Sequence, residues 1–312
     1  VLGSDDTIAV ELETGTGAVH TAPGYGKEDY LCGLKNGLEI IVTVDEKGHQ
    51  TEGAGPFTGM YYAKSDKEII KWLEENNLLL ASEQINHSYP HCWRCKHPVI
   101  YRATSQWFAS IEEFRKPALE AIKKVKWYPA WGEERITKMI EDRNDWCISR
   151  QRTWGVPLPI FYCKECEKEY VTNESLDKII NIVREKGTNA WFDMTEKELM
   201  PEGAKCSECG CTEFKKETDI MDVWFDSGST HESVLAERGI PDANLYLEGN
   251  DQYRGWFQSS LLTSIATKDK APYKEVVTHG MLVDEQGRKM SKSLGNVISP
   301  QDIIKEFGAD IL

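Results

Sequence analysis

The chain has 312 residues, of which 40% are apolar and 28% are charged, and its 51 acidic and 37 basic side chains give a formal net charge of −14. This composition is typical of a globular protein, and the negative charge argues against a protein that coats nucleic acid by bulk electrostatics. No apolar run approaches the ~20 residues of a membrane span, and the first ten residues lack a signal-peptide pattern, so we expect a cytoplasmic protein.

The first quarter of the chain is predicted to form a strand followed by a helix. Residues 39–44, EIIVTV, are rich in β-branched side chains and end at the turn-forming run DEKGH, which favours a strand. Ser65 and Glu68 form a capping box, which predicts a helix from that point through Leu73. We expect this helix to end near Asn76 and Asn77.

The next region is predicted to contain one strand and two helices. PVIYRATS, at 98–105, is strand-like, and apolar spacing predicts helices around 111–124 and 133–143. Pro117 is expected in the first turn of its helix or at a kink, because proline cannot donate a backbone hydrogen bond.

The second half combines a small insertion with an alternating pattern. Residues 158–218 contain an amphipathic helix at 175–186, which Gly187 ends. Beyond Asp219 the pattern is a strand at LYLEG, a helix from near Gln252, a strand at VVTHGMLV, and a final helix that begins at Ser299 with proline in its first position. Strands that alternate with helices predict a parallel α/β sheet.

Six of the nine cysteines form three C-x-x-C pairs. Because the chain lacks a secretory signal, we interpret these pairs as metal knuckles rather than disulfides. Two pairs predict a closed, structural four-thiolate zinc site, and its ligands would be Cys163, Cys166, Cys206 and Cys209. Cys211 competes with one member of the second of these pairs, and the remaining pair, Cys92 and Cys95, makes only half a site.

A lysine-rich loop lies near the carboxyl end, in the run GRKMSKSLGN. Lys289 and Lys292 stand three residues apart between glycines at 287 and 295, which favours a mobile loop that presents positive charge. Positioned ammonium groups stabilise the charge that develops on a leaving pyrophosphate, so the loop is suited to the triphosphate of ATP. By its own composition the loop is better explained as a basic surface turn, and only the surrounding segments favour the phosphate role.

The segments around this loop carry a family resemblance. They are DVWFDSGSTH (222–231), LYLEGNDQYRGWFQSSL (245–261) and VVTHGMLVDEQGRKMSKSLGN (276–296), with WCISRQRTWGVPLPIFYC (146–163) and HCWRCKHPVIYRATSQWF (91–108) in support. Over essentially its whole length the chain resembles the class I aminoacyl-tRNA synthetases. The DVWFDSG and EGNDQYRGWF segments are most similar to those of the isoleucine-specific members.

The resemblance implies an α/β fold made of the second half of a Rossmann catalytic domain, a small zinc-bearing insertion and the tail of a β-rich editing domain. The implied boundaries are 1–85 for the editing domain, 86–157 for the return into the catalytic domain, 158–218 for the insertion and 219–312 for the second Rossmann half. The family's His-x-Gly-His segment and its anticodon-binding domain are not found in the sequence. We therefore expect a fragment of a longer, monomeric enzyme that is inactive by itself.

The resemblance also implies ATP-dependent formation of isoleucyl-adenylate, with Mg²⁺, and transfer of L-isoleucine to tRNA(Ile). Lys292 matches the lysine that touches the phosphates, supported by Lys289, and Glu248 matches the acid that contacts the adenylate. The ribose would be approached by Gly249, Asp251 and Gln252, the adenine held by His279, Met281 and Leu282, and the isoleucine pocket walled by Trp224 and Trp256. Core packing is the alternative for each tryptophan and for His279.

The run GTGAVHTAPGYGKEDY, at 15–30, resembles the family's editing site, which hydrolyses valyl products. On that pattern Asp29 holds the α-amino group of the misacylated residue, and His20 lies nearby. Tyr25 departs from the pattern, because a histidine is common at that position. Without the resemblance, GTG and PGYG would be interpreted as turns.

Two other functions remain open. A valine-specific synthetase is disfavoured by the DVWFDSG segment, and a non-catalytic, zinc-bearing RNA-binding module is disfavoured by the KMSKS and EGNDQ segments. Local basic residues can supply parts of an RNA track despite the negative net charge, namely Lys123, Lys124, Lys126, Arg288, Lys289 and Lys292.

Overall fold

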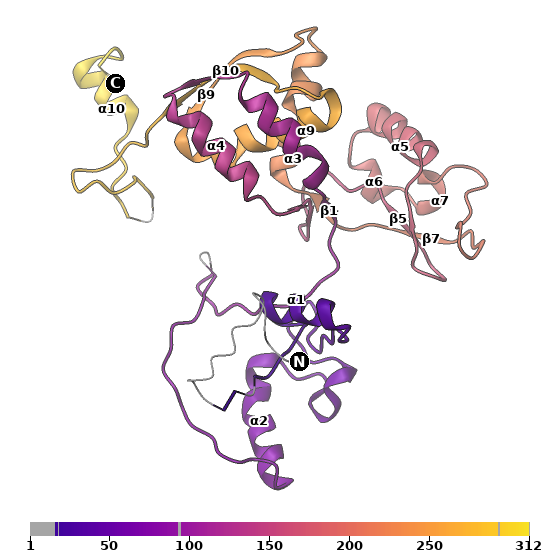
Figure 1. Ribbon diagram of the computed structural model, residues 1–312. Helices are drawn as coiled ribbons and strands as arrows, with labels where there is room; N and C mark the ends of the chain where they lie inside the picture. The colour runs from indigo at the N-terminus through magenta and orange to yellow at the C-terminus, as the bar shows by residue number, and fades with distance from the viewer. Residues whose placement is uncertain (1–15, 18, 93–94, 293, 312) are drawn as a thin grey trace. The chain divides into compact units, whose positions relative to one another are not determined.

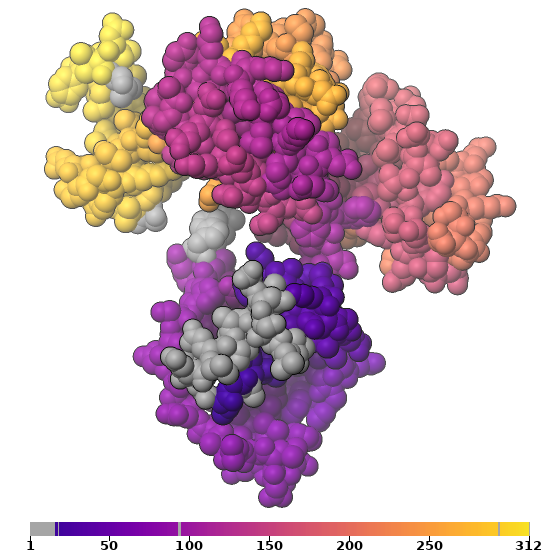
Figure 2. All heavy atoms as spheres, viewed as in Figure 1, coloured from indigo at the N-terminus to yellow at the C-terminus, as the bar shows by residue number. Residues whose placement is uncertain are grey.

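Residues 16–17, 19–92, 95–292 and 294–311 are described by the structure, which is a computed structural model. The chain divides into two units, residues 1–105 and residues 106–312. In Figures 1 and 2 the first unit runs from indigo to purple and the second from magenta to yellow. None of the described helices is long and apolar enough to cross a membrane.

The first unit contains helix α1 (Lys27–Asn36), the 3₁₀ helix η1 (Glu52–Phe57) and helix α2 (Tyr62–Glu75). The predicted strand at 39–44 is wrong: Val44 forms a single antiparallel bridge with Gln50, and the run pairs with no other segment of the chain that the structure describes. In the β-branched run the backbone N–H of Thr43 donates to the Tyr25 hydroxyl at 2.8 Å instead of to a strand. An extended run becomes a strand only where a neighbouring strand pairs with it.

Two further predictions for this unit need correction. Residues 98–105 form no strand, since Pro98 makes one isolated bridge and Ala103 donates its N–H to Gly24. Helix α2 begins at Tyr62, so Ser65 lies inside the helix and caps nothing; its hydroxyl donates to the Tyr62 carbonyl at 2.6 Å. The end of α2 at Glu75 agrees with the prediction.

The second unit is built on a parallel sheet of three strands in the order β2 (Lys126–Tyr128), β10 (Tyr273–His279) and β9 (Ala243–Gly249). This confirms the predicted parallel α/β arrangement. Helices α3 (Glu112–Ile122), α4 (Trp131–Glu141) and α9 (Trp256–Lys268) pack with the sheet around one apolar core (Figure 1). The fully buried members of that core include Ile122, Ile136, Ile140, Tyr253, Phe257, Leu261 and Val276.

The two predicted helices at 111–124 and 133–143 are confirmed as α3 and α4 within two residues at each end. Pro117 is the sixth residue of α3, beyond the first turn. The helix expected from Gln252 begins later: the 3₁₀ helix η3 (Asn250–Arg254) intervenes, and α9 starts at Trp256. The predicted strand VVTHGMLV ends at its fourth residue, because β10 stops at His279.

The insertion has its own core. Strands β6 (Glu169–Tyr170), β5 (Phe161–Cys163) and β7 (Phe214–Lys216) form an antiparallel sheet beside α5 (Asn173–Lys186), α6 (Ala190–Asp193) and α7 (Glu196–Leu199). The predicted amphipathic helix is confirmed as α5, which Thr172 caps and Gly187 ends. The buried core is formed by Phe161, Cys163, Ile179, Trp191, Leu199, Met200, Cys206 and Phe214.

Short elements connect the insertion to the sheet. Strands β1 (Phe108–Ala109) and β3 (Trp146–Cys147) pair with each other, as do β4 (Ser149–Arg150) and β8 (Ile220–Met221). Because β4 precedes the insertion and β8 follows it, the chain enters and leaves the insertion side by side. Helix α8 (Val223–Gly228), the π-helix η2 (His231–Ala236) and α10 (Pro300–Phe307) complete the unit, and Ser299 is the N-cap residue of α10, as predicted.

Candidate active site and metal centre

The polar residues predicted to bind the adenylate gather where two parallel strands end. Strands β9 and β10 pair in register, so that Thr278 is opposite Glu248 and His279 is opposite Gly249. Carboxyl ends of adjacent parallel strands are where open α/β sheets bind ligands. The Glu248 carboxylate accepts a hydrogen bond from the Gly249 N–H at 2.8 Å, and His279 is exposed.

Gly249 lies against the ends of two neighbouring side chains. A Cβ atom at this position would lie 2.7 Å from the Met281 methyl carbon and 2.9 Å from an Asp251 carboxylate oxygen. Its φ of −65° is open to any residue, so a larger residue here would be limited by space, and it would have to displace the ends of the Met281 and Asp251 side chains. The structure therefore brings Gly249, Asp251 and Met281 to one point, whereas Leu282 is 71% exposed.

Gln252 and Trp224 meet at the start of α9. A Cβ at Gly255 would lie 2.6 Å from the Gln252 side-chain oxygen and 2.9 Å from the Trp224 ring. The Gln252 side chain accepts from the Trp256 backbone N–H at 3.0 Å and so caps the first turn of α9.

The two predicted pocket tryptophans differ in their surroundings. Trp224 is 41% exposed and has a free ring surface. The Trp256 ring stacks on Tyr246 at 3.9 Å with an interplanar angle of 8°, and its ring N–H donates to the Ser227 carbonyl at 3.0 Å. One face of Trp256 therefore belongs to the core.

A buried acid supports the helix that carries Trp224. Asp222 is 4% exposed, and its carboxylate accepts from the Trp146 ring N–H at 2.9 Å and from the Trp224 backbone N–H at 3.3 Å. An Arg150 guanidinium nitrogen lies 2.9 Å away. Burial, together with the negative charge of Asp222, raises the pKa of the neighbouring Asp226. From the sequence, Asp222 could have been recognised only as an aspartate that suits the N-cap position of a short helix, and not as a buried hydrogen-bond acceptor.

The lysine loop follows β10. Lys289 and Lys292 are both exposed, and within the described part of the chain neither ammonium group forms an ion pair. Val283 and Lys289 form one antiparallel bridge, so the segment folds back on itself. The last serine of the motif, residue 293, lies outside the described residues.

Four thiols of the insertion form a metal-type cluster, with all their sulfur atoms within 4.8 Å of one another. The Sγ atoms of Cys163 and Cys209 are 3.5 Å apart, as are those of Cys166 and Cys206. These distances exclude disulfides, and they suit tetrahedral zinc, in which Zn–S bonds of ~2.3 Å put the sulfurs about 3.8 Å apart.

Each half of the cluster is a tight backbone turn. Glu167 donates its N–H to the Cys163 carbonyl at 3.0 Å, and Gly210 does the same to Cys206 at 3.0 Å, both with positive φ. A hydrogen bond from the Cys166 backbone N–H makes the largest contribution to lowering the pKa of the Cys163 thiol, which falls to about 6. The lowered pKa favours the thiolate, the form that binds metal.

Two cysteine assignments left open by the sequence can be compared directly. Cys211 lies outside the four-thiol cluster, and its sulfur accepts from the Glu213 N–H at 3.3 Å. At the pair Cys92 and Cys95, Lys96 donates its N–H to the Cys92 carbonyl at 2.8 Å and has a positive φ, of 63°, in the same way as Glu167 and Gly210 in the cluster. Within the described residues this pair has no third ligand.

The predicted editing residues lie in the first unit. Asp29 is in the first turn of α1, and one carboxylate oxygen accepts from the Ala22 N–H at 2.8 Å. His20 is exposed, and two residues of the same motif, 15 and 18, lie outside the described residues.

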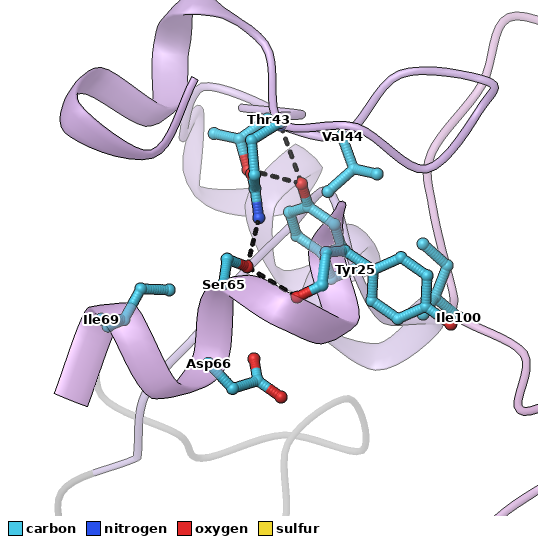
Figure 3. A pocket seen from close by; sticks show the side chains of 9 residues that line it. Tyr25, Thr43, Val44, Ser65, Asp66, Ile69 and Ile100 are labelled. Carbon is cyan, nitrogen blue, oxygen red and sulfur yellow. Dashed lines mark hydrogen bonds between the residues drawn. The ribbon is translucent and has the colours of Figure 1, made fainter. Parts of the chain in front are cut away.

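A small open cavity lies beside this segment (Figure 3). It measures about 210 Å³, and its walls include Tyr25, Thr43, Ser65 and Ile69. The Tyr25 hydroxyl is held by Thr43, whose Oγ1 atom lies at 2.8 Å.

Comparison with known proteins gives the family. The family model described as tRNA synthetases class I (I, L, M and V) matches residues 12–312. The chain belongs to the class I tRNA synthetases. Isoleucine--tRNA ligase of Caldanaerobacter subterraneus subsp. tengcongensis is 60% identical over 307 residues, and that of Caldicellulosiruptor saccharolyticus is 62% identical over 305 residues.

Each alignment covers 97% of this chain and 33% of the relative, so this class I synthetase chain spans about a third of the length of the curated relatives it matches. A crystal structure of a ternary LeuRS-tRNA-LeuAMS complex from Agrobacterium radiobacter K84 is 26% identical, covers 57% of this chain and 26% of its own, and has a TM-score of 0.36. The family assignment rests on sequence.

The basic residues of this synthetase chain are partly neutralised. Lys123 lies 2.8 Å from Glu120, and Lys126 lies 3.3 Å from Glu275. Arg288 pairs with Asp284 at 2.8 Å. Of the six basic residues suggested for an RNA track, three are therefore engaged with carboxylates.

Proposed function

We propose that the chain is part of an isoleucine–tRNA ligase, which activates isoleucine with ATP and transfers it to tRNA(Ile). In this proposal residues 219–312 form the second half of a Rossmann catalytic domain, residues 158–218 a zinc-bearing insertion, residues 86–157 the return into the catalytic domain and residues 1–85 the tail of an editing domain. The observation that carries the proposal is the register of β9 and β10, which sets the family-specific residues Glu248, Gly249 and His279 at one sheet edge.

Activation joins a carboxylate oxygen of isoleucine to the α-phosphorus of ATP while the bond to the pyrophosphate oxygen breaks. Charge accumulates on the leaving pyrophosphate, so positioned cations lower the barrier more than covalent chemistry can. Lys292, with Lys289 in support, is suited to that role because both ammonium groups are exposed on one short loop. Magnesium bound to the triphosphate would add charge neutralisation.

The adenylate would lie along the ends of β9 and β10. One oxygen of Glu248 accepts from Gly249, and the carboxylate retains acceptor capacity for the substrate ammonium group. Gly249 has no side chain of its own, which permits close approach of the ribose to its backbone, with Asp251 and Gln252 beside it. The adenine would contact the segment that starts at His279 and includes Met281 and Leu282.

The isoleucine side chain would contact Trp224 and the uncovered part of Trp256. Trp224 has a ring surface open to a ligand, whereas Trp256 is fixed from behind by Tyr246. A wall fixed by stacking suits a pocket that distinguishes side chains by size, because its position cannot adjust to a smaller ligand.

The four-cysteine cluster would hold one zinc ion through Cys163, Cys166, Cys206 and Cys209. With four protein ligands the ion has no open position, so its role is structural. Two of these cysteines are members of the insertion's buried core, so zinc ligation and folding of the insertion would be coupled.

The editing role would fall on Asp29, with His20 nearby. The Asp29 carboxylate is fixed by one backbone N–H and can accept from the α-amino group of a misacylated residue through its other oxygen.

Pyrophosphate exchange into ATP tests the activation role. In the full-length protein that contains this chain, exchange should depend on isoleucine, and Lys292→Ala should slow it at least tenfold, or about 1.4 kcal/mol in transition-state stabilisation. Lys305→Ala, which removes an exposed lysine from α10, is the matched control and should leave the rate unchanged. Equal loss in both variants, or no loss in Lys292→Ala, would refute the assigned role.

A further inference from the structure

A single carboxylate closes the turn that precedes the two lysines. One oxygen of Asp284 accepts from the backbone N–H groups of Gln286 at 3.1 Å and Arg288 at 2.8 Å. The other oxygen accepts from the Arg288 side chain, whose two nitrogens lie at 2.9 and 2.8 Å. The Asp284 side chain is only 12% exposed, whereas that of Arg288 is 57% exposed. The acid is thus enclosed by its own loop.

Asn296 joins this turn to the far side of the lysine loop. Its amide nitrogen donates to Asp284 at 2.9 Å, and its amide oxygen accepts from the Ser291 backbone N–H at 2.9 Å. The same nitrogen lies 3.5 Å from the Lys289 carbonyl. The Asn296 side chain therefore links Asp284 to the backbone of the lysine loop at Ser291 and Lys289.

The chain contains the same turn a second time. VDEKGH at 44–49 and VDEQGR at 283–288 share their spacing. Asp45 accepts from the N–H groups of Lys47 and His49, each at 2.8 Å, and Gly48 has a φ of 82° where Gly287 has 74°. The turn itself is therefore not specific to the lysine loop. Asp284 differs from Asp45 in its contact with Asn296 and in the two nitrogens of Arg288 that face one of its oxygens.

The contacts of Asp284 also determine which positive charges of the loop stay unpaired. Asp284 neutralises Arg288, while Lys289 and Lys292 have no ion pair within the residues that the structure describes. The closed loop therefore exposes the ammonium groups of Lys289 and Lys292, while the charge of Arg288 is neutralised by Asp284.

We propose that Asp284 and Asn296 are positioning residues that hold the lysine loop closed, so that Lys289 and Lys292 meet the leaving pyrophosphate together. This inference rests on the proposed function. The loop lies between β10 and α10, drawn in yellow in Figure 1. The Asn296 amide and then the N–H groups of Arg288 lower the pKa of Asp284, so the carboxylate stays ionised at neutral pH.

Exchanging the two side chains tests the contact. Asp284→Asn sets an amide nitrogen against the Asn296 nitrogen, and Asn296→Asp sets two carboxylates together, so each single change breaks the pair. The double variant restores a donor opposite an acceptor between these two side chains, whereas the amide at 284 no longer accepts from the Arg288 side chain. In the full-length enzyme we expect each single variant to lower the kcat of isoleucine-dependent pyrophosphate exchange about tenfold with an unchanged KM for isoleucine, and the double variant to recover part of the loss.

Asp45→Asn is the matched control, because it alters the same turn far from the lysines in sequence, and it should not change the exchange rate. Trypsin gives a readout that needs no activity: cleavage after Lys289 and Lys292 should be faster in both single variants and slower again in the double variant, because the contact between residues 284 and 296 is restored.

The outcomes separate the two proposals. A parent enzyme without isoleucine-dependent exchange overturns the proposed function and this role with it. An active parent whose single variants keep their rate, or whose double variant stays as slow as the singles, overturns the inference alone. A loss equal to that of Asp45→Asn, or a raised KM for isoleucine, shows general damage to the fold and also overturns it.

Discussion

Replacing Asp222 by alanine should loosen the start of α8 and with it Trp224, the proposed wall of the isoleucine pocket. The change leaves the Trp146 ring N–H, on a side chain that is 7% exposed, without its acceptor, which costs about 1–3 kcal/mol. Loss of the cap on α8 costs about 1 kcal/mol more. Arg150 is 37% exposed and can turn to water, so its ion pair contributes little. We expect a total loss of about 2–4 kcal/mol.

Native-state hydrogen exchange of the α9 amides measures this loss within the second unit, because it reports local opening free energies. Trp146→Phe removes the orphaned donor, so the double variant should lose about 1–2 kcal/mol less than the two single losses together. Asp226→Ala is the control: its carboxyl has a raised pKa beside Asp222, so its removal should not destabilise the unit. Additive losses in the double variant would refute the assigned hydrogen bond.

Three further predictions concern the metal, the strand edge and pH. Cys206→Ser with Cys209→Ser should abolish binding of about one zinc ion per chain by metal analysis, whereas Cys211→Ser should retain it. Gly249→Ala should raise the KM for ATP at least tenfold in pyrophosphate exchange, because its methyl group would displace Met281 and Asp251, the residues proposed to contact the adenine and the ribose. Burial, with a neighbouring ammonium group, lowers the pKa of His231 below 6.5, so the unfolded chain takes up a proton that the folded chain excludes; the melting temperature should fall as pH drops through about 6.5, and less so in His231→Phe.

The sequence pattern predicted the helices that are specified by residues close together in the chain. Helices α3, α4 and α5 follow from apolar spacing, and α5 ends at Gly187 as expected, because the φ of 78° there suits glycine. The motif order also placed Glu248 and His279 correctly on separate strands. Their register, which makes them neighbours, depends on the pairing of β9 with β10 across the intervening helix.

Elements that depend on distant partners could not be predicted in the same way. The run at 39–44 has strand composition but forms a single bridge, at Val44. Ser65 looked like a cap, yet its hydroxyl is satisfied inside α2. The acceptor role of Asp222 depends on Trp146, which lies 76 residues earlier, and the Asp284–Asn296 contact spans 12 residues. Spacing rules for helices and strands do not reach such pairs.

The most direct test of the account is the exchange of labelled pyrophosphate into ATP by the full-length protein, with isoleucine, valine or leucine supplied separately. We predict the highest kcat/KM with isoleucine, weaker exchange with valine, and loss of at least tenfold in Lys292→Ala. Exchange that is fastest with valine, or absent with all three amino acids, would contradict the account.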